Sequence, residues 1–257
     1  MTTNPQPSAT NAALLRTREL TLDTGATPFD LEFPAGRIVG VAGLEGHGQD
    51  RLLHVLAGLT PPVGGTIEMD GEPLPGGAPS SLRDAFRHGI AYVPRDRKVE
   101  GIFPALSVLD NFAISTLREH TRFGIVNAKS VRRRFDAFAD QLGLVTAGPG
   151  ASIRSLSGGN QQKVLLARWL AAGPRVLLLN DPSRGVDHRT RLALYGLYRR
   201  VADEGAAIVL LSTEIEELLM VADEIVVFRD KSVSGRLVGD DRDRDRVLAA
   251  MFGVNRV

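Results

Sequence analysis

The sequence contains no cysteine, few aromatic residues and no excess of either charge. The absence of cysteine excludes disulfide bonds, thiolate metal sites and cysteine nucleophiles. The 31 basic and 30 acidic residues give a formal net charge of +1, so the chain lacks the basic surplus with which proteins bind nucleic acid regardless of sequence. Aromatic residues make up 5% of the chain, too few to suggest a surface on which bases stack. We therefore expect no nucleic-acid partner.

Long hydrophobic runs are also missing. The longest, Ala206 to Leu211, has six residues, whereas a membrane-spanning helix needs about 20. Residues 1–13 contain neither Lys nor Arg and no apolar stretch, so they predict a flexible tail rather than a signal peptide. Any role at a membrane would be peripheral. The 43% of hydrophobic residues is ordinary for a globular protein with a substantial core.

Short apolar runs alternate with amphipathic segments through most of residues 14–257, which we expect to form a single domain. Buried strands are predicted at residues 37–42, 89–93, 175–179, 206–211 and 224–228. The helices that alternate with them are predicted at 50–59, 157–172, 187–203 and 214–222. This order is typical of an α/β fold with a mainly parallel sheet and helices on both faces.

Two further groups of elements lie outside this alternation. Strands predicted at 14–22, 29–33 and 65–70 are separated by Gly, Pro and Asp-Gly turn signals and indicate a small antiparallel part. Helical patterns at 107–117 and 130–142 predict a helical subdomain at about residues 95–156.

A glycine-rich segment follows the predicted strand at 37–42. Its residues are Gly43, Leu44, Glu45, Gly46, His47, Gly48, Gln49 and Asp50. The glycine spacing and the position between a strand and a helix are those of a phosphate-binding P-loop, whose backbone N–H groups turn toward an anion. However, Gln49 replaces the lysine that contacts phosphate, and Asp50 replaces the hydroxyl that holds Mg²⁺. A tight strand-to-helix turn without a ligand is the alternative interpretation.

Three later segments favour the P-loop interpretation. They are Tyr92-Val93-Pro94-Arg95-Asp96-Arg97, Leu156-Ser157-Gly158-Gly159-Asn160-Gln161-Gln162-Lys163 and Asn180-Asp181-Pro182-Ser183-Arg184-Gly185-Val186-Asp187. Together with the P-loop they resemble the nucleotide-binding domain of ATP-binding cassette (ABC) transporters. The second segment is most similar to importers of ribose-, galactose- or xylose-type sugars. The resemblance covers about residues 16–236 and implies a P-loop ABC cassette that binds ATP and Mg²⁺.

The resemblance also implies roles for particular residues and partners. The nucleotide site would include Arg95 and Asn180 besides the P-loop. The signature motif, which in this family contacts ATP held by a second cassette, would consist of Ser157, Gly158, Gly159, Asn160 and Gln161. The implied partners are therefore a second cassette in a homodimer or heterodimer, an integral membrane permease and, indirectly, a solute-binding protein. The chain would then lie at the cytoplasmic face of the cell membrane.

The segment Arg95 to Leu109 is our candidate for the surface that docks on the permease. Ile102, Phe103 and Leu106 offer apolar contacts there, and the alternative is that these three side chains belong to the core.

Several positions that carry chemistry in the family differ in this chain. Asn180 occupies the position of a Mg²⁺-associated aspartate, so Asp50 and Asn180 are weak candidates for metal ligands. Asp181 is one methylene shorter than the glutamate that polarises the attacking water, and Thr213 replaces the switch histidine. Arg95 occupies the position of a glutamine. Phosphoryl transfer depends on positioning and electrostatic stabilisation, so these changes predict that Asp181 and Thr213 are degenerate catalytic positions.

We therefore expect an ATP-binding subunit with a degenerate nucleotide site of its own and an intact signature motif, similar to the second cassette of importers that fuse two cassettes. The start at Met1 and the end after one cassette predict a partner on a separate chain. A split subunit, a fragment and a divergent duplicate all remain open, as does the transported solute. Two alternatives are a regulatory or scaffold pseudo-ATPase, and a working ATPase in which Arg95 or Lys98 replaces the lost lysine charge.

Overall fold

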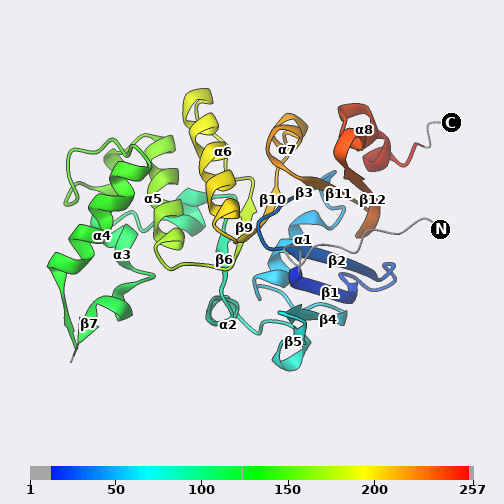
Figure 1. Ribbon diagram of the computed structural model, residues 1–257, viewed down its shortest axis with the longest axis horizontal. Coiled ribbons are helices and arrows are strands. Elements are labelled where there is room, and N and C mark those ends of the chain that lie inside the picture. The colour runs from blue at the N-terminus through cyan, green and yellow to red at the C-terminus, as the bar shows by residue number, and fades with distance from the viewer. Residues whose placement is uncertain (1–12, 123, 255–257) are drawn as a thin grey trace, which may run out of the picture.

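Two β-sheets form the body of the protein, which a computed structural model describes for residues 13–122 and 124–254 (Figure 1). The larger sheet has six strands in the order β12-β11-β3-β10-β9-β6. β12 is antiparallel to β11, and the remaining neighbours are parallel. The strands are β3 (Ile38–Gly43), β6 (Ile90–Val93), β9 (Val176–Asn180), β10 (Ala207–Leu211), β11 (Glu224–Arg229) and β12 (Ser232–Val238).

The central strands are apolar along their whole length because both faces of the larger sheet are covered. In β9, Leu177 and Leu179 belong to one core, whereas Val176 and Leu178 belong to the other, as the two-residue period of a strand requires. The first core includes α5 (Gly158–Leu170), α6 (His188–Asp203), α7 (Ile215–Val221) and α8 (Arg244–Phe252). The second core includes α1 (Gln49–Leu56). The predicted parallel sheet with helices on both faces is thus confirmed.

The smaller sheet is antiparallel and contributes to the second core. Its order is β2-β1-β4-β5, with β1 at Ala13–Thr21, β2 at Phe29–Pro34, β4 at Gly64–Met69 and β5 at Glu72–Pro73. Alternate residues of β2, namely Phe29, Leu31 and Phe33, are buried in this core. The predicted small antiparallel part is therefore present. A short helix, α2 (Leu82–Arg87), leads from it to β6.

Helices α3 (Val108–Ala113) and α4 (Ala128–Gln141) pack with α5 at one end of the molecule (Figure 1). The Phe112 ring lies 5.5 Å from the Phe135 ring and 5.7 Å from the Phe138 ring, measured between centroids. The short strands β7 (Thr121–Arg122) and β8 (Ile125–Val126) form a hairpin before α4. These elements fall in the range where we expected a helical subdomain.

Some elements differ from the sequence-based expectation. Ala13, which we assigned to the tail at 1–13, is the first residue of β1, and the rest of that tail lies outside the described residues. The helix expected at 107–117 is shorter, because α3 ends at Ala113. We did not predict α2 or β12. No helix within the described residues combines the length and the apolar character that a bilayer crossing requires.

Candidate nucleotide site

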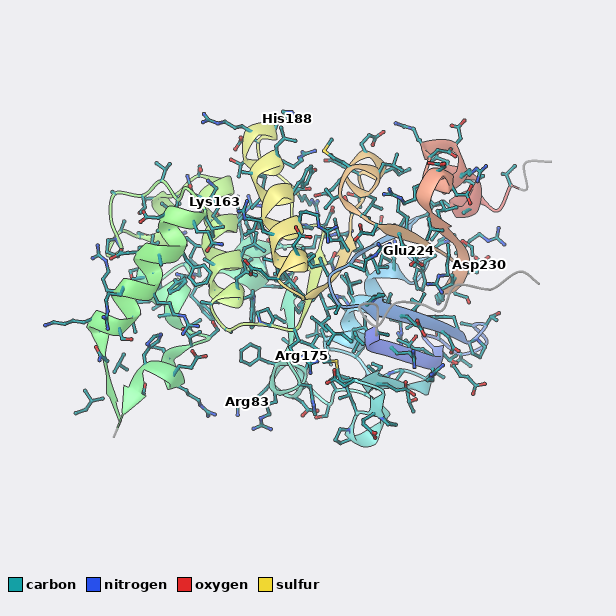
Figure 2. All side chains as sticks on the ribbon, in the orientation of Figure 1. Arg83, Lys163, Arg175, His188, Glu224 and Asp230 are labelled. Carbon is teal, nitrogen blue, oxygen red and sulfur yellow. The ribbon has the colours of Figure 1, made fainter. Side chains whose placement is uncertain are left out.

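The loop between β3 and α1 has the tight form that the glycine spacing predicted. Gly46 and Gly48 have φ angles of 82° and 109°, which favour glycine. A Cβ atom on Gly48 would lie 2.8 Å from the Cα atom of Lys231, so no larger residue fits. Lys231 belongs to the turn between β11 and β12, where Figure 2 labels Asp230. The β11–β12 turn therefore packs directly on the loop.

Gln49, at the lysine position of the P-loop, turns back into the protein. Its side chain is buried, and its Nε2 donates to the carbonyl oxygens of Gly43 at 3.3 Å and Leu44 at 2.8 Å. A Cβ atom on Gly43 would lie 2.8 Å from the Gln49 Oε1, so the two residues are in close contact. Gln49 thus stabilises the loop by hydrogen bonds to its backbone. Its amide hydrogens are donated to protein carbonyl oxygens and not to a phosphate.

Asn180, at the end of β9, lies between Asp50 and Tyr92. Its Nδ2 donates to Asp50 Oδ1 at 3.3 Å and contacts the Tyr92 hydroxyl at 3.2 Å. Burial raises the pKa of Tyr92 to about 12, so its hydroxyl keeps its proton at neutral pH. The Oδ1 of Asn180 is buried and has no hydrogen-bond partner among the described residues. The sequence-predicted residues Asp50 and Asn180 are therefore brought together.

Asp181 and Thr213, the two degenerate catalytic positions, are hydrogen-bonded to each other. β9 and β10 are parallel neighbours, so the residues that follow them lie at the same edge of the sheet. Asp181 Oδ1 accepts from the Thr213 backbone N–H at 3.2 Å, and the Thr213 hydroxyl donates to Asp181 Oδ2 at 3.1 Å. Asp181 is buried and has a φ of 49°. Its carboxylate is therefore held in place by Thr213.

Arg95 lies between the carboxylates of Asp50 and Asp181. Its Nη1 is 3.7 Å from Asp50 Oδ1, and its Nε is 3.4 Å from Asp181 Oδ2. The alternative in which Arg95 supplies a free positive charge does not match this geometry, because the guanidinium is already paired with two acids. Lys98, the other residue in that alternative, is exposed. The three charged groups carry one net negative charge, which opposes the binding of phosphate.

The signature segment begins helix α5 with an ordinary side-chain cap. The Ser157 Oγ accepts from the Asn160 backbone N–H at 3.4 Å and from its Nδ2 at 3.0 Å. Asn160 Oδ1 in turn accepts from the Val145 N–H at 3.0 Å. The buried side chain of Gln161 donates to the carbonyl oxygen of Ile153 at 3.2 Å. Asn160 and Gln161 therefore connect the start of α5 with the backbone at Val145 and Ile153.

The two signature glycines have close side-chain neighbours. A Cβ atom on Gly158 would lie 2.5 Å from Arg97 Nη2, and one on Gly159 would lie 2.9 Å from Thr190 Cγ2. Arg97 also donates to the Arg184 carbonyl oxygen at 2.8 Å, so it connects the start of α5 with the loop after β9. Arg97 is the last residue of the Tyr92–Arg97 segment quoted from the sequence, but we gave it no role of its own there.

Comparison with known proteins identifies the family. A family model described as ABC transporter matches residues 26–184, which is more than half of the chain. The chain belongs to the ABC transporter family. A ribose import ATP-binding protein (RbsA 2) of Rubrobacter xylanophilus is 38% identical over 96% of this chain and 47% of its own length. A putative ribose/galactose/methyl galactoside import ATP-binding protein of Pseudomonas fluorescens is 37% identical over 94% and 46%. The chain thus spans about half the length of these curated ABC relatives.

Solved structures of ABC cassettes share the fold. A nucleotide-free ATP-binding cassette from an ABC transporter superposes with a TM-score of 0.76 at 16% identity, covering 92% of this chain and 95% of that one. A dimeric cassette described as a post-hydrolysis state bound to ADP and phosphate gives a TM-score of 0.71 at 20% identity, covering 86% and 97%. The P-loop ABC fold expected from the sequence is therefore confirmed.

ABC ATPases generally bind ATP with Mg²⁺, and the residues at this chain's own site do not fit that ion. Asn180 presents amide hydrogens to Asp50, and the guanidinium of Arg95 lies between Asp50 and Asp181. A divalent cation between these carboxylates would be repelled by the arginine. No cluster of three or more His, Asp or Glu side chains suited to a metal occurs within residues 13–122 and 124–254. This geometry argues against Asp50 and Asn180 as weak Mg²⁺ ligands, and that assignment stays a prediction.

Proposed function

We propose that the chain is an ATP-binding subunit of an importer for sugars or similar small solutes. In this proposal its signature motif completes an ATP site on a partner cassette, while its own site does not hydrolyse ATP. The names of the relatives, which include ribose and galactose import, support the class of solute. The subunit would lie at the cytoplasmic face of the membrane, bound to a permease that receives solute from a binding protein.

The single observation that carries the proposal is the pairing of Arg95 with Asp50 and Asp181. Hydrolysis requires a group that positions water and positive charge that stabilises the transferred phosphoryl group. Here the candidate base, Asp181, is occupied by Thr213 and Arg95. Among the described residues, no comparable ion pair covers the start of α5, where Ser157, Gly158 and Gly159 precede the helix interior. In this chain, the P-loop half of an ATP site therefore has its acidic groups paired with Arg95, whereas the signature half at the start of α5 is not covered in this way.

The loop after β6 supports the assignment of a permease dock. Phe103 is 44% exposed, whereas Ile102 is 7% exposed and belongs to the core, so the expected contact surface shrinks to Phe103 and its neighbours. Asn111 Nδ2 donates to the Phe103 carbonyl oxygen at 2.9 Å, and Arg168 Nη1 donates to that of Gly101 at 2.5 Å. These buried polar groups hold Phe103 at the surface.

A cavity of about 280 Å³ lies beside this loop, between the sheet-bearing part and the helical region. Its lining includes Leu59, Leu82 and Trp169, and the first two are more than 40% exposed. An apolar hollow next to an exposed aromatic ring fits a short amphipathic segment of a partner protein. We assign that segment to the permease.

The proposal can be tested by complementation between two inactive forms of this chain. The first is the wild-type chain. The second, which we name the restored variant, carries family-type residues in the nucleotide site and a blocked signature motif. Its substitutions are Gln49→Lys, Asp50→Ser, Arg95→Gln, Asn180→Asp, Asp181→Glu, Thr213→His and Gly158→Asp.

We expect neither form to hydrolyse ATP alone and a mixture of the two to do so, because only the mixed dimer combines a complete P-loop with a free signature helix. The restored variant with Gly158 retained serves as the positive control and should be active by itself. Full ATPase activity of the wild-type chain alone would contradict the proposal. An active positive control combined with a silent mixture would contradict it as well.

A further inference from the structure

Arg95 brings three separate parts of the chain together at the nucleotide site. Asp50 comes from the first turn of α1, Asp181 follows β9, and Arg95 follows Pro94 at the end of β6. The side chain of Asp181 is 4% exposed, whereas those of Arg95 and Asp50 are 28% and 31% exposed. The guanidinium therefore neutralises a buried carboxylate from the solvent side.

The oxygen atoms around Arg95 are of the type that binds divalent cations. Two carboxylates face the guanidinium, and carboxylate and amide oxygens are preferred ligands of Mg²⁺ and Mn²⁺. Asn180, which is 2% exposed and contacts Asp50, has an Oδ1 without a hydrogen-bond partner among the described residues. Without the arginine, the side chains of Asp50, Asp181 and Asn180 would offer a set of oxygen ligands to a cation.

Arg95 is suited to take the place of such an ion. A guanidinium stays charged at all physiological pH values, and it is anchored covalently, so it requires no dissolved metal. Its Nε is buried and makes no hydrogen bond, although it lies 3.4 Å from Asp181 Oδ2. The contact is thus an ion pair without a hydrogen bond from Nε.

We propose that Arg95 is a built-in counter-cation that replaces the divalent metal ion at this chain's own nucleotide site. It excludes metal from the Asp50–Asp181 pair and makes polyphosphate binding at this site independent of Mg²⁺. Only the polyphosphate part of the inference rests on the proposed function, because metal exclusion concerns the protein without nucleotide.

The first experiment measures Mn²⁺ binding by electron paramagnetic resonance in the absence of nucleotide. We expect no specific binding by the wild-type chain and binding at least about tenfold tighter by Arg95→Gln, which uncovers the oxygen donors. Arg95→Lys retains the charge and should still exclude the metal. Arg83→Gln is the matched control, because Arg83 is exposed on α2 (Figure 2). Thermal melting establishes that all four proteins are folded.

Two results of this experiment would overturn the inference. Specific Mn²⁺ binding by the wild-type chain would show that the arginine does not exclude metal. Equal absence of binding in wild type and Arg95→Gln would show that something other than Arg95 excludes it.

The second experiment measures ATP binding by calorimetry with Mg²⁺ and with EDTA. For the wild-type chain we expect weak binding whose affinity differs by less than about twofold between the two conditions, whereas Mg²⁺ should strengthen binding to Arg95→Gln about tenfold. Mg²⁺-dependent binding by the wild-type chain would overturn the inference. If the wild-type chain binds no ATP in either condition, the proposal that its own site binds nucleotide is wrong. The Mn²⁺ experiment then still decides whether Arg95 excludes metal.

Discussion

Helices α1 and α5 both have glycine at their start, Gly48 as the N-cap of α1 and Gly158 as the first residue of α5, yet the two helix starts differ in what their side chains do. At α1, Gln49 bonds to loop carbonyls and Asp50 faces Arg95. At α5, Ser157 caps the helix and Gly158 lies beside Arg97. A helix N-terminus attracts anions through its dipole and free N–H groups. The comparison predicts that this backbone property does not by itself define a phosphate site, because the charged side chains nearby also affect whether an anion binds.

The largest effect is expected from an acidic residue at the start of α5. Gly158→Asp in the otherwise wild-type chain should abolish complementation of the restored variant, with ATPase activity at least about 100-fold lower, because the carboxylate repels the partner's phosphate. Gly196→Asp is the matched control, since Gly196 is exposed on α6 and its Cβ would lie 3.7 Å from Arg200 Nη1. Complementation that survives Gly158→Asp would remove the proposed role of α5.

The next effect concerns the start of α1. The double substitution Gln49→Lys and Asp50→Ser should strengthen ATP binding about tenfold or more, because a charge-assisted contact contributes about 1.5–3 kcal/mol. Turnover should stay near zero, since Asp181 is still held by Thr213. Calorimetry and a steady-state ATPase assay separate the two quantities. A double variant with full hydrolysis would place the defect at α1 alone.

A smaller effect separates stability from function at Thr213, in the candidate nucleotide site, and at Ser157, at the start of α5. Thr213→Val removes the hydroxyl that donates to Asp181 and should lower the free energy of unfolding by about 1 kcal/mol. Ser157→Ala removes the cap of α5 and should lower it by about 1 kcal/mol as well. Only Ser157→Ala should also weaken complementation. Urea denaturation followed by the mixed-dimer ATPase assay tests this, and equal effects on activity would contradict the distinction.

The smallest effect concerns Glu217, which joins the loops carrying Asp181 and Thr213. Its Oε2 accepts from the hydroxyls of Ser183 at 2.8 Å and Ser212 at 2.5 Å. Burial raises the pKa of Glu217 above its ordinary value of 4.5. The carboxyl group of Glu217 therefore binds its proton more tightly in the folded protein than in the unfolded chain. Ionising Glu217 therefore costs stability as pH rises above about 4.5.

We expect Glu217→Gln to gain stability relative to the wild-type chain between pH 5 and 8, since glutamine keeps an oxygen acceptor and cannot ionise. Melting temperatures of both proteins across this range measure the difference. A difference that is constant with pH, or that shrinks as pH rises, would show that Glu217 does not titrate in this way.

The secondary structure could largely be predicted because buried parallel strands are continuous apolar runs. The run at 206–211 corresponds to β10 at Ala207–Leu211, and the run at 224–228 corresponds to β11 at Glu224–Arg229. In contrast, β12 lies at an edge of the sheet and is partly exposed, so its sequence carries no clear apolar signal. α8 begins within a run of alternating charges, where Asp243 caps it.

The sequence alone determined the family resemblance and the order of its motifs. Glycine spacing, apolar runs and the identities at Gln49, Asp50, Asn180 and Asp181 are local properties that can be read along the chain. They also indicated that positive charge and metal ligands were lost from the nucleotide site.

Only the tertiary structure decided where Arg95 and Arg97 lie. The pairing of Arg95 with Asp50 and Asp181, and the contact of Arg97 with Gly158, join segments that are far apart in sequence. Parallel strands bring the residues after their carboxyl ends to one edge of the sheet, but side-chain directions at that edge depend on packing across several elements. An arginine at position 95 could have faced solvent, a partner protein or a phosphate, and it is the fold that places it between two acids.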